Sequence, residues 1–212
     1  MDFKQLLCDS FTKNGLPVPN DVLSDMFFRF TEHLLEVNQV TNLTAIRDVP
    51  SIITKHYVDS LLISADIPEN ARVLDLGCGP GFPSIPLAIY RPDLEIVSLD
   101  STAKKIAFVK ESAELLELKN LTTLSGRAEN RAVMQRLGKF DVVTSRAVAN
   151  LNVLAELCLP YLKIGGKMLA MKGAKIKEET DELLRGRAIE LLGAVAPSIR
   201  TWELLLDRKS VV

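Results

Sequence analysis

The residues best suited to chemistry lie together in a glycine-rich turn. An apolar run at 73–76 leads into Gly77, Gly79 and Gly81, and an apolar, helix-like run follows. Glycine permits a sharp turn and lets the backbone lie against a ligand with no Cβ in the way. The first turn of a following helix offers free N–H groups to an anionic group. We therefore expect a nucleotide-type ligand here, and we expect Gly77 and Gly79 to leave no room for a side chain.

The spacing of the glycines separates two classes of nucleotide-binding protein. A dinucleotide fingerprint G-x-G-x-x-G that starts at Gly77 needs glycine at position 82, where this chain has Phe82. A nicotinamide oxidoreductase is therefore disfavoured. The pattern present, D-x-G-x-G-x-G from Asp75 to Gly81, resembles the first motif of S-adenosylmethionine-dependent methyltransferases. The alternative is an ordinary glycine-rich turn that binds no ligand.

A second acid, Asp100, ends the next apolar strand about one βα unit later. A carboxylate at the tip of the second strand can accept both hydroxyl hydrogens of a ribose. The alternative is that Asp100 caps the helix that follows it, and the two roles are compatible.

Composition excludes several other classes. The chain has 212 residues, of which 47% are apolar, and a net charge of −1, so as a whole it is not a basic nucleic-acid binder. The first 70 residues are acidic and the stretch 71–180 is mildly basic, which allows a basic face on the second part. Three cysteines without C-x-x-C and only two histidines argue against disulfides and metal. No apolar run is long enough for a membrane span, so we expect a cytoplasmic monomer without metal or membrane contact.

Helical spacing of apolar residues predicts an N-terminal helical cap over residues 1–66. Its helices are expected at 3–13, from the N-cap Asn20 to about 37, and at about 50–65, with a polar loop at 38–48. Residues 67–212 are expected to form one S-adenosylmethionine-binding methyltransferase domain.

In the second part, predicted strands alternate with predicted helices. The strands are expected at 72–76, 94–99, 121–125, 140–145 and 167–171, and the helices near 84–90, 102–117, 129–137, 149–162 and 176–192. Such alternation predicts an α/β, Rossmann-like fold, a mostly parallel central sheet with helices on both faces. One or two further strands are expected within 195–207.

Seven blocks of sequence carry a more specific resemblance. In order, they are NLTAIRD at 42–48, KHYVDS at 55–60, DLGCGPGFPSIP at 75–86, LDS at 99–101, SGRAE at 125–129, SRA at 145–147 and KG at 172–173. Together they resemble the bacterial ribosomal RNA small subunit methyltransferase G family, also called RsmG or GidB, over about residues 25–175. The resemblance implies methylation of N7 of one guanine in the decoding-site loop of 16S ribosomal RNA, with S-adenosylmethionine as cofactor. A non-catalytic, ribosome-associated cofactor-binding module and a methyltransferase of the same fold with another substrate remain alternatives.

The resemblance also implies cofactor-binding residues. They are the acid and glycines of the turn with Phe82, the strand-end acid Asp100, the pair after the third strand, and the arginine that ends the fourth strand: Asp75, Gly77, Gly79, Gly81, Phe82, Asp100, Ala128, Glu129 and Arg146. Three of these have simpler alternatives. Phe82 suits a core position, Glu129 suits the first turn of a helix, and Arg146 suits a solvated surface.

The remaining implied residues belong to the RNA side. Arg146 and Lys172 are the catalytic candidates, as groups that hold the base or a nearby phosphate. Arg47, Lys55 and His56 on the cap are candidates for contact with RNA phosphates, with a surface charge or a core-edge histidine as the alternative. No general base is expected, because guanine N7 already carries a free lone pair. At its C-terminus, WELLLDRK at 202–209, the chain departs from the family pattern, so RNA contact there is in doubt.

Overall fold

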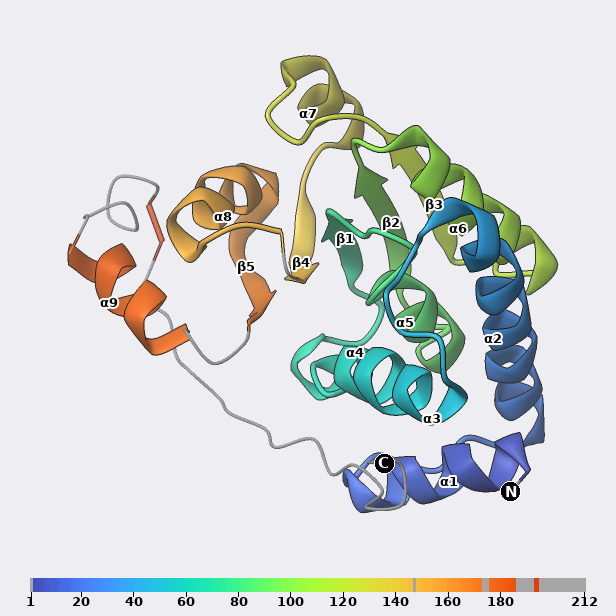
Figure 1. Ribbon diagram of the computed structural model, residues 1–212. Helices are drawn as coiled ribbons and strands as arrows, with labels where there is room; N and C mark the ends of the chain where they lie inside the picture. The colour runs from blue at the N-terminus through green and yellow to red at the C-terminus, as the bar shows by residue number, and fades with distance from the viewer. Residues whose placement is uncertain (1, 147, 173–175, 186–192, 195–212) are drawn as a thin grey trace.

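A five-stranded, all-parallel sheet forms the centre of the molecule (Figure 1). The computed structural model describes residues 2–146, 148–172, 176–185 and 193–194. The strands are β1 (Arg72–Leu76), β2 (Glu95–Asp100), β3 (Leu121–Ser125), β4 (Phe140–Arg146) and β5 (Leu162–Met171), in the order β3-β2-β1-β4-β5. All carboxyl ends therefore meet at one edge, and the predicted Rossmann-like α/β fold is confirmed.

Helices cover both faces of the sheet. The helices after the first two strands, α5 (Ser84–Tyr90) and α6 (Ala103–Leu115), share one face with the cap, whereas α7 (Arg131–Leu137), α8 (Leu151–Cys158) and α9 (Ile176–Arg185) cover the other (Figure 1). Successive strand residues alternate between the two apolar clusters: Val73 packs into the first and Leu74 into the second. The change of face occurs between β1 and β4, which is where open α/β sheets bind their ligands.

The N-terminal cap consists of α1 (Phe3–Lys13), α2 (Asp21–Thr41) and a helical segment over 49–61. That segment begins as α3 (Val49–Ile52), passes through a π-helical stretch (Ile53–Val58) and ends as α4 (Asp59–Leu61). Aromatic residues of the cap join the core of the sheet domain. The ring centroids of Phe30, in α2, and Tyr57, in the π-helical stretch, lie within 6.3 Å of the Phe82 ring centroid. One apolar cluster thus crosses the predicted boundary at residue 66. The division into cap and domain stays a prediction from sequence.

Local interactions explain where the helices begin and where the predictions missed. Asn20 caps α2 by accepting from the Leu23 N–H at 3.0 Å. The helix continues past 37 to Thr41 because Asn38, predicted to be in a loop, is buried and binds the backbone of Thr44. The predicted helix at 149–162 ends at Cys158, and β5 begins at 162, ahead of the predicted 167. Predictions for 186–192 and 195–207 lie outside the described residues.

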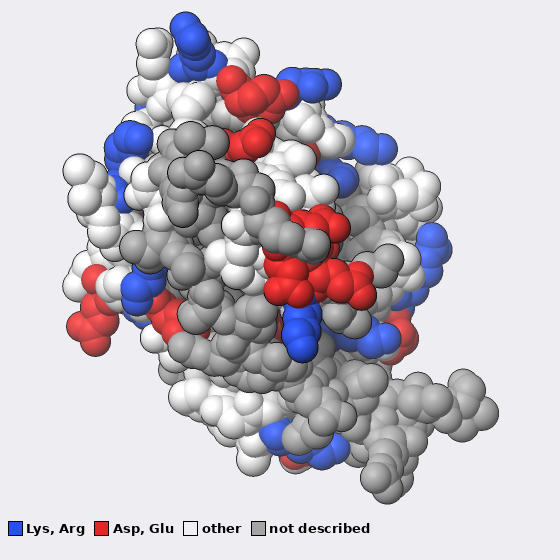
Figure 2. Space-filling view, turned by 90° about the vertical axis from the view of Figure 1, so that its left-hand side faces the viewer, with Lys and Arg blue, Asp and Glu red and all other residues white. Residues whose placement is uncertain are grey.

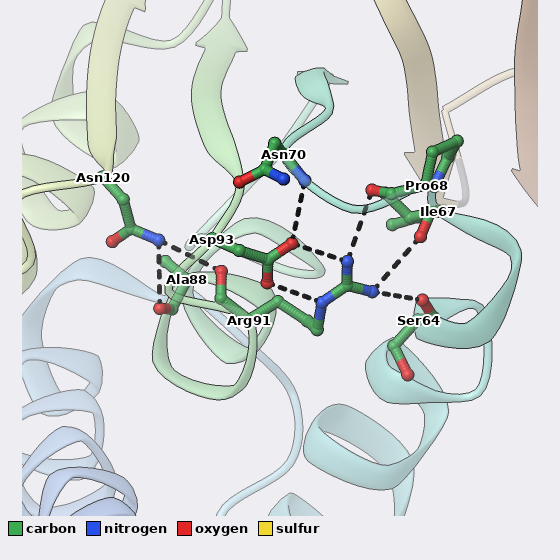
Figure 3. A network of polar contacts seen from close by, with 8 residues as sticks. All are labelled: Ser64, Ile67, Pro68, Asn70, Ala88, Arg91, Asp93 and Asn120. Atoms are coloured by element: carbon green, nitrogen blue, oxygen red, sulfur yellow. Dashed lines mark hydrogen bonds and ion pairs between the residues drawn. The ribbon is translucent and has the colours of Figure 1, made fainter.

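Arg91 fastens the end of the cap to the sheet domain (Figure 3). Its Nε and Nη2 donate to the two oxygens of Asp93, each at 2.7 Å. The other guanidinium hydrogens donate to the carbonyls of Ser64, Ile67 and Pro68 at 2.8–3.3 Å. All five N–H donors are therefore used, and Arg91 holds the pKa of Asp93 down at about 2.

Replacing Arg91 with lysine is expected to destabilise the fold by about 1–2 kcal/mol, because an ammonium cannot reach these acceptors together and leaves carbonyls without partners. The change is measured as the midpoint of urea unfolding at constant slope. Arg127→Lys, whose side chain is exposed, is the matched control and should shift stability by less than about 0.5 kcal/mol. Equal midpoints for the two variants would show that the Arg91 contacts contribute nothing.

Candidate functional site

The glycine turn lies where the strand order predicts a ligand, at the carboxyl end of β1. Gly77, Gly79 and Gly81 all have positive φ, at +74°, +56° and +94°. The Gly77 N–H donates to the Leu99 carbonyl of β2 at 2.7 Å, which fixes the turn to the neighbouring strand. The sequence requires glycine here because side chains rarely adopt this backbone conformation.

The three glycines face different surroundings. A Cβ on Gly77 would lie 2.4 Å from Val148, and one on Gly81 would lie 2.5 Å from Ile85. A Cβ on Gly79 would have no atom within 4 Å from any described residue apart from its two chain neighbours. The expectation that Gly79 leaves no room is therefore wrong as far as the protein is concerned, because only its backbone conformation restricts it. Gly79 borders open space at the ligand-binding edge.

Asp75, near the end of β1, stabilises this turn. Its carboxylate is fully buried and accepts from the Ser84 N–H at 3.0 Å and from the Thr144 hydroxyl at 3.4 Å. Burial raises the pKa of Asp75 to about 6. The residue therefore joins the end of β1 to the start of α5 and to β4, which holds the turn in shape.

Asp100 points at the same turn from the tip of β2. One carboxylate oxygen accepts from the Gly79 N–H at 3.0 Å and the other from the Thr102 N–H at 2.8 Å. The N-cap of α6 is Thr102, so Asp100 is not its cap. Each oxygen keeps a second lone pair that a ribose hydroxyl can use.

The pair after β3 completes this side of the site. The Ala128 carbonyl accepts from the Tyr161 hydroxyl at 2.7 Å, which ties this loop to the segment before β5. Glu129 is exposed and forms an ion pair with Arg127 at 3.4 Å. Because α7 is capped by Asn130 and begins at Arg131, Glu129 is not a first-turn acid of that helix.

Arg146 ends β4 and reaches across to the π-helical part of the cap. Nη1 donates to the Asp59 carboxylate at 3.0 Å and to the Lys55 carbonyl at 3.1 Å, and Nη2 donates to Nδ1 of His56 at 3.1 Å. The guanidinium lies 5.2 Å from the centre of the Phe82 ring. It is therefore held by the cap and is not a free surface cation.

His56 is enclosed in this arrangement. Its ring stacks on Phe82 at 4.2 Å, and Nε2 meets the Thr44 hydroxyl at 2.9 Å. Burial, followed by the charge of Arg146, lowers the pKa of His56 to about 4, so it is neutral at pH 7. Phe82 is itself only 2% exposed, which agrees with the core alternative considered for it.

The remaining candidate cations differ in their availability. Lys172, next to the end of β5, forms an ion pair with Glu179 at 2.7 Å, donates to the Ala149 carbonyl and is 10% exposed. Arg47 and Lys55 on the cap are exposed. Sequence reasoning missed Thr44 and Asp59, although both stand in blocks that carry the family resemblance.

Other surfaces offer less. A cavity of about 550 Å³ lies at the opposite edge of the sheet, beside the Arg91–Asp93 pair, and contains none of the residues above. Figure 2 shows acidic side chains gathered on the face that carries α9, which exposes Glu178, Asp181 and Glu182. Within the described ranges, no three metal-binding side chains gather as a metal site requires. None of the described helices is both long and apolar enough to cross a membrane.

Fold and turn together define a class of protein, the methyltransferases with a Rossmann-like fold. The structure is similar to a putative protein-L-isoaspartate O-methyltransferase from Plasmodium falciparum, solved in complex with S-adenosyl-L-homocysteine, with a TM-score of 0.50 and 17% identity. That likeness covers 79% of this chain and 83% of the other, and it shows the fold alone.

The family follows from sequence similarity. The family model for rRNA small subunit methyltransferase G matches residues 24–202, so the chain belongs to this family. It is 41% identical to the ribosomal RNA small subunit methyltransferase G of Oceanobacillus iheyensis, over 87% of this chain and 78% of that protein. Identity to the protein of that name from Acetivibrio thermocellus is 38%, over 96% and 84% of the two chains.

Proposed function

We propose that this protein uses S-adenosylmethionine to methylate N7 of one guanine in the decoding-site loop of 16S ribosomal RNA. Family membership supports the class of reaction and of substrate. The observation that supports N7 is that two ionisable groups that could serve as a base, Asp75 and His56, are already engaged by protein partners. Asp75 binds Ser84, and His56 lies between Arg146 and Thr44. Guanine N7 needs no base, since its lone pair is free.

The residues present fit such a cofactor. Gly79 leaves open space beside a backbone that can approach a ligand, and Asp100 keeps lone pairs for the two ribose hydroxyls. Ala128 and Glu129, at the end of β3, are suited to line the adenine side. When bound, the cofactor supplies a methyl group that its positive sulfur has already activated.

The chain itself contributes positioning. Holding the reacting atoms in line can lower a barrier by roughly 7–11 kcal/mol, so no catalytic base is required. Arg146 and Lys172 stand at the ends of neighbouring parallel strands and act on the base or a nearby phosphate. The held guanidinium of Arg146 is suited to that task because its three protein contacts fix its plane.

The RNA must present its base outside a regular helix, because the major groove of A-form RNA is too deep and narrow to reach N7. Arg47 and Lys55 are the exposed cap cations for phosphate contact, and His56 is placed behind them as a support for Arg146. The acidic face of α9 repels phosphates.

The decisive experiment incubates the protein with small ribosomal subunits, or with 16S RNA, and methyl-labelled cofactor. Reduction and aniline cleavage, which cut RNA at N7-methylguanine, then locate the label. We expect cleavage at one guanine of the decoding-site loop. Label at another atom would contradict N7 specificity, and binding of cofactor without transfer would favour a non-catalytic module.

Asp100→Ala is expected to weaken cofactor binding by about 1.5–3 kcal/mol, the contribution of hydrogen bonds to a charged group. Isothermal titration calorimetry measures the change. Asp100→Asn is the matched control: it can still accept from the Gly79 N–H, so it separates the effect of the turn contact from that of the ribose contacts. An unchanged dissociation constant for Asp100→Ala would reduce the residue to a support of the turn.

Replacing Arg47 and Lys55 together with alanine should weaken RNA binding and reduce its dependence on salt. Each phosphate that the variant no longer neutralises lowers the slope by about 0.7 log units per log unit of salt. Binding is measured at several salt concentrations by filter retention. The control is Lys139→Ala with Lys163→Ala, which removes the same charge at the amino ends of β4 and β5. If the cap variant keeps the parent's salt slope and methylation rate, Arg47 and Lys55 do not contact RNA phosphates.

A further inference from the structure

Within the described ranges, two N–H donors of Arg146 have no protein partner. Both hydrogens of Nη1 are engaged, by Asp59 and the Lys55 carbonyl, and one hydrogen of Nη2 is engaged by His56. The Nε–H and the second Nη2 hydrogen have no partner among the residues that the structure describes. The side chain is 17% exposed, at the edge that carries the glycine turn. Two donors of one planar group are thus available to a ligand.

The guanidinium is held rigidly in this orientation. Arginine only donates, so Nδ1 of His56 must accept, and the His56 proton must then lie on Nε2 and donate to Thr44. The Thr44 hydroxyl also accepts from the Ile46 N–H at 3.1 Å, which keeps it in place. Phe82 supports both the imidazole and the guanidinium through its ring. A donor pair fixed in this way is suited to select one acceptor geometry.

We propose that the Nε–H and the free Nη2–H of Arg146 donate to O6 of the target guanine, with His56 and Asp59 as positioning residues. This inference rests on the proposed function and names the contact that selects the base. It assigns the two free donors of Arg146 to the base and not to the cofactor, the role that the family resemblance implies for this residue. The common arginine contact to guanine uses O6 and N7 together, but N7 must stay free to receive the methyl group, which leaves O6. Adenine has an amino donor at the same position and would face two donors, so it is rejected.

The charge balance of the reaction fits a paired arginine. The N7 lone pair forms the new N–C bond, the S–C bond breaks, and its electron pair stays on sulfur, so the purine gains a positive charge. An isolated cation at O6 would oppose that charge. The Asp59 carboxylate, 3.0 Å from Nη1, neutralises the guanidinium, and His56 adds no charge because it is neutral. The donors therefore remain while the repulsion is reduced.

The test replaces the target guanine in an RNA substrate with 2,6-diaminopurine, which keeps N7 but has an amino group in place of O6. We expect kcat/KM of the unmodified protein to be about 5- to 150-fold higher for guanine, the range for removal of one bidentate base contact. Arg146→Met should bring the ratio close to one. Lys139→Ala, at the amino end of β4 and away from Arg146, is the control and should leave the ratio unchanged.

His56 variants test the positioning role. His56→Phe keeps a ring on Phe82 but offers no acceptor to Arg146, so the ratio should fall. His56→Asn restores an acceptor and should recover part of it, which a purely structural role would not produce. An unchanged ratio in Arg146→Met overturns the inference while the proposed function stands. Failure of the unmodified protein to methylate guanine N7 at all would instead overturn the proposed function.

Discussion

Gly79→Leu is expected to abolish cofactor binding in calorimetry while the circular dichroism spectrum stays native. The leucine side chain would project into the open space beside the turn, where an added Cβ has no atom of a described residue within 4 Å apart from its chain neighbours. On the proposed function, it occupies space that the bound cofactor needs. The φ of +56° lies in the left-handed region, which costs a non-glycine residue about 1–2 kcal/mol.

Gly15→Leu is the matched control for that backbone cost. Gly15 has a φ of +70°, and an added Cβ there also has no atom of a described residue within 4 Å apart from its chain neighbours. It lies in the turn after α1, away from the carboxyl edge of the sheet. It should lose similar stability and keep full cofactor affinity. Native-strength binding by folded Gly79→Leu would show that the cofactor does not approach this turn.

The parts of the site that are local in sequence were predictable. A strand, a turn that needs glycine and a helix follow from residues within 73–90, and the strand positions follow from apolar runs with helices between them. Asp75 was identified as the acid of the D-x-G-x-G-x-G pattern, and Asp100 as the acid at the tip of the next strand. The structure adds that they act from two sides of the turn, since Asp100 reaches the Gly79 N–H and Asp75 holds the start of α5.

The cap side of the site could not be derived from spacing. Arg146 meets His56 and Asp59 across about 90 residues of chain, and periodicity carries no information about such a contact. The π-helical stretch that brings these cap residues to one side looks like an ordinary helix in the sequence. Asn38 was placed in a loop because of its polarity, although its side chain is buried to hold Thr44. Polar partners that hydrophobic periodicity does not reveal override local preference at these positions.

Asp75→Asn is expected to change how stability depends on pH. Burial raises the pKa of Asp75 from 3.8 to about 6, so between these values the folded state binds the proton more tightly than the unfolded state. Stability from this group is therefore greatest below pH 4 and falls as the pH rises to 6, by about 3 kcal/mol. Asparagine lacks the charge, so the variant should gain about that much relative to the parent across this interval.

His56 works in the opposite direction over the same interval, which makes the comparison with Asp75 informative. Its pKa is lowered from 6.5 to about 4, so the unfolded state takes up the proton first, and stability from His56 is lost as the pH falls through that range. Because the two contributions are of similar size, about 3 kcal/mol each, they largely cancel in the parent protein. Urea unfolding at pH 4, 5, 6 and 7 should show Asp75→Asn gaining stability relative to the parent as pH rises, and His56→Phe losing it. Parallel curves for parent and Asp75→Asn would mean that this carboxyl ionises in the folded protein as it does in water, and that its burial in the turn carries no electrostatic cost.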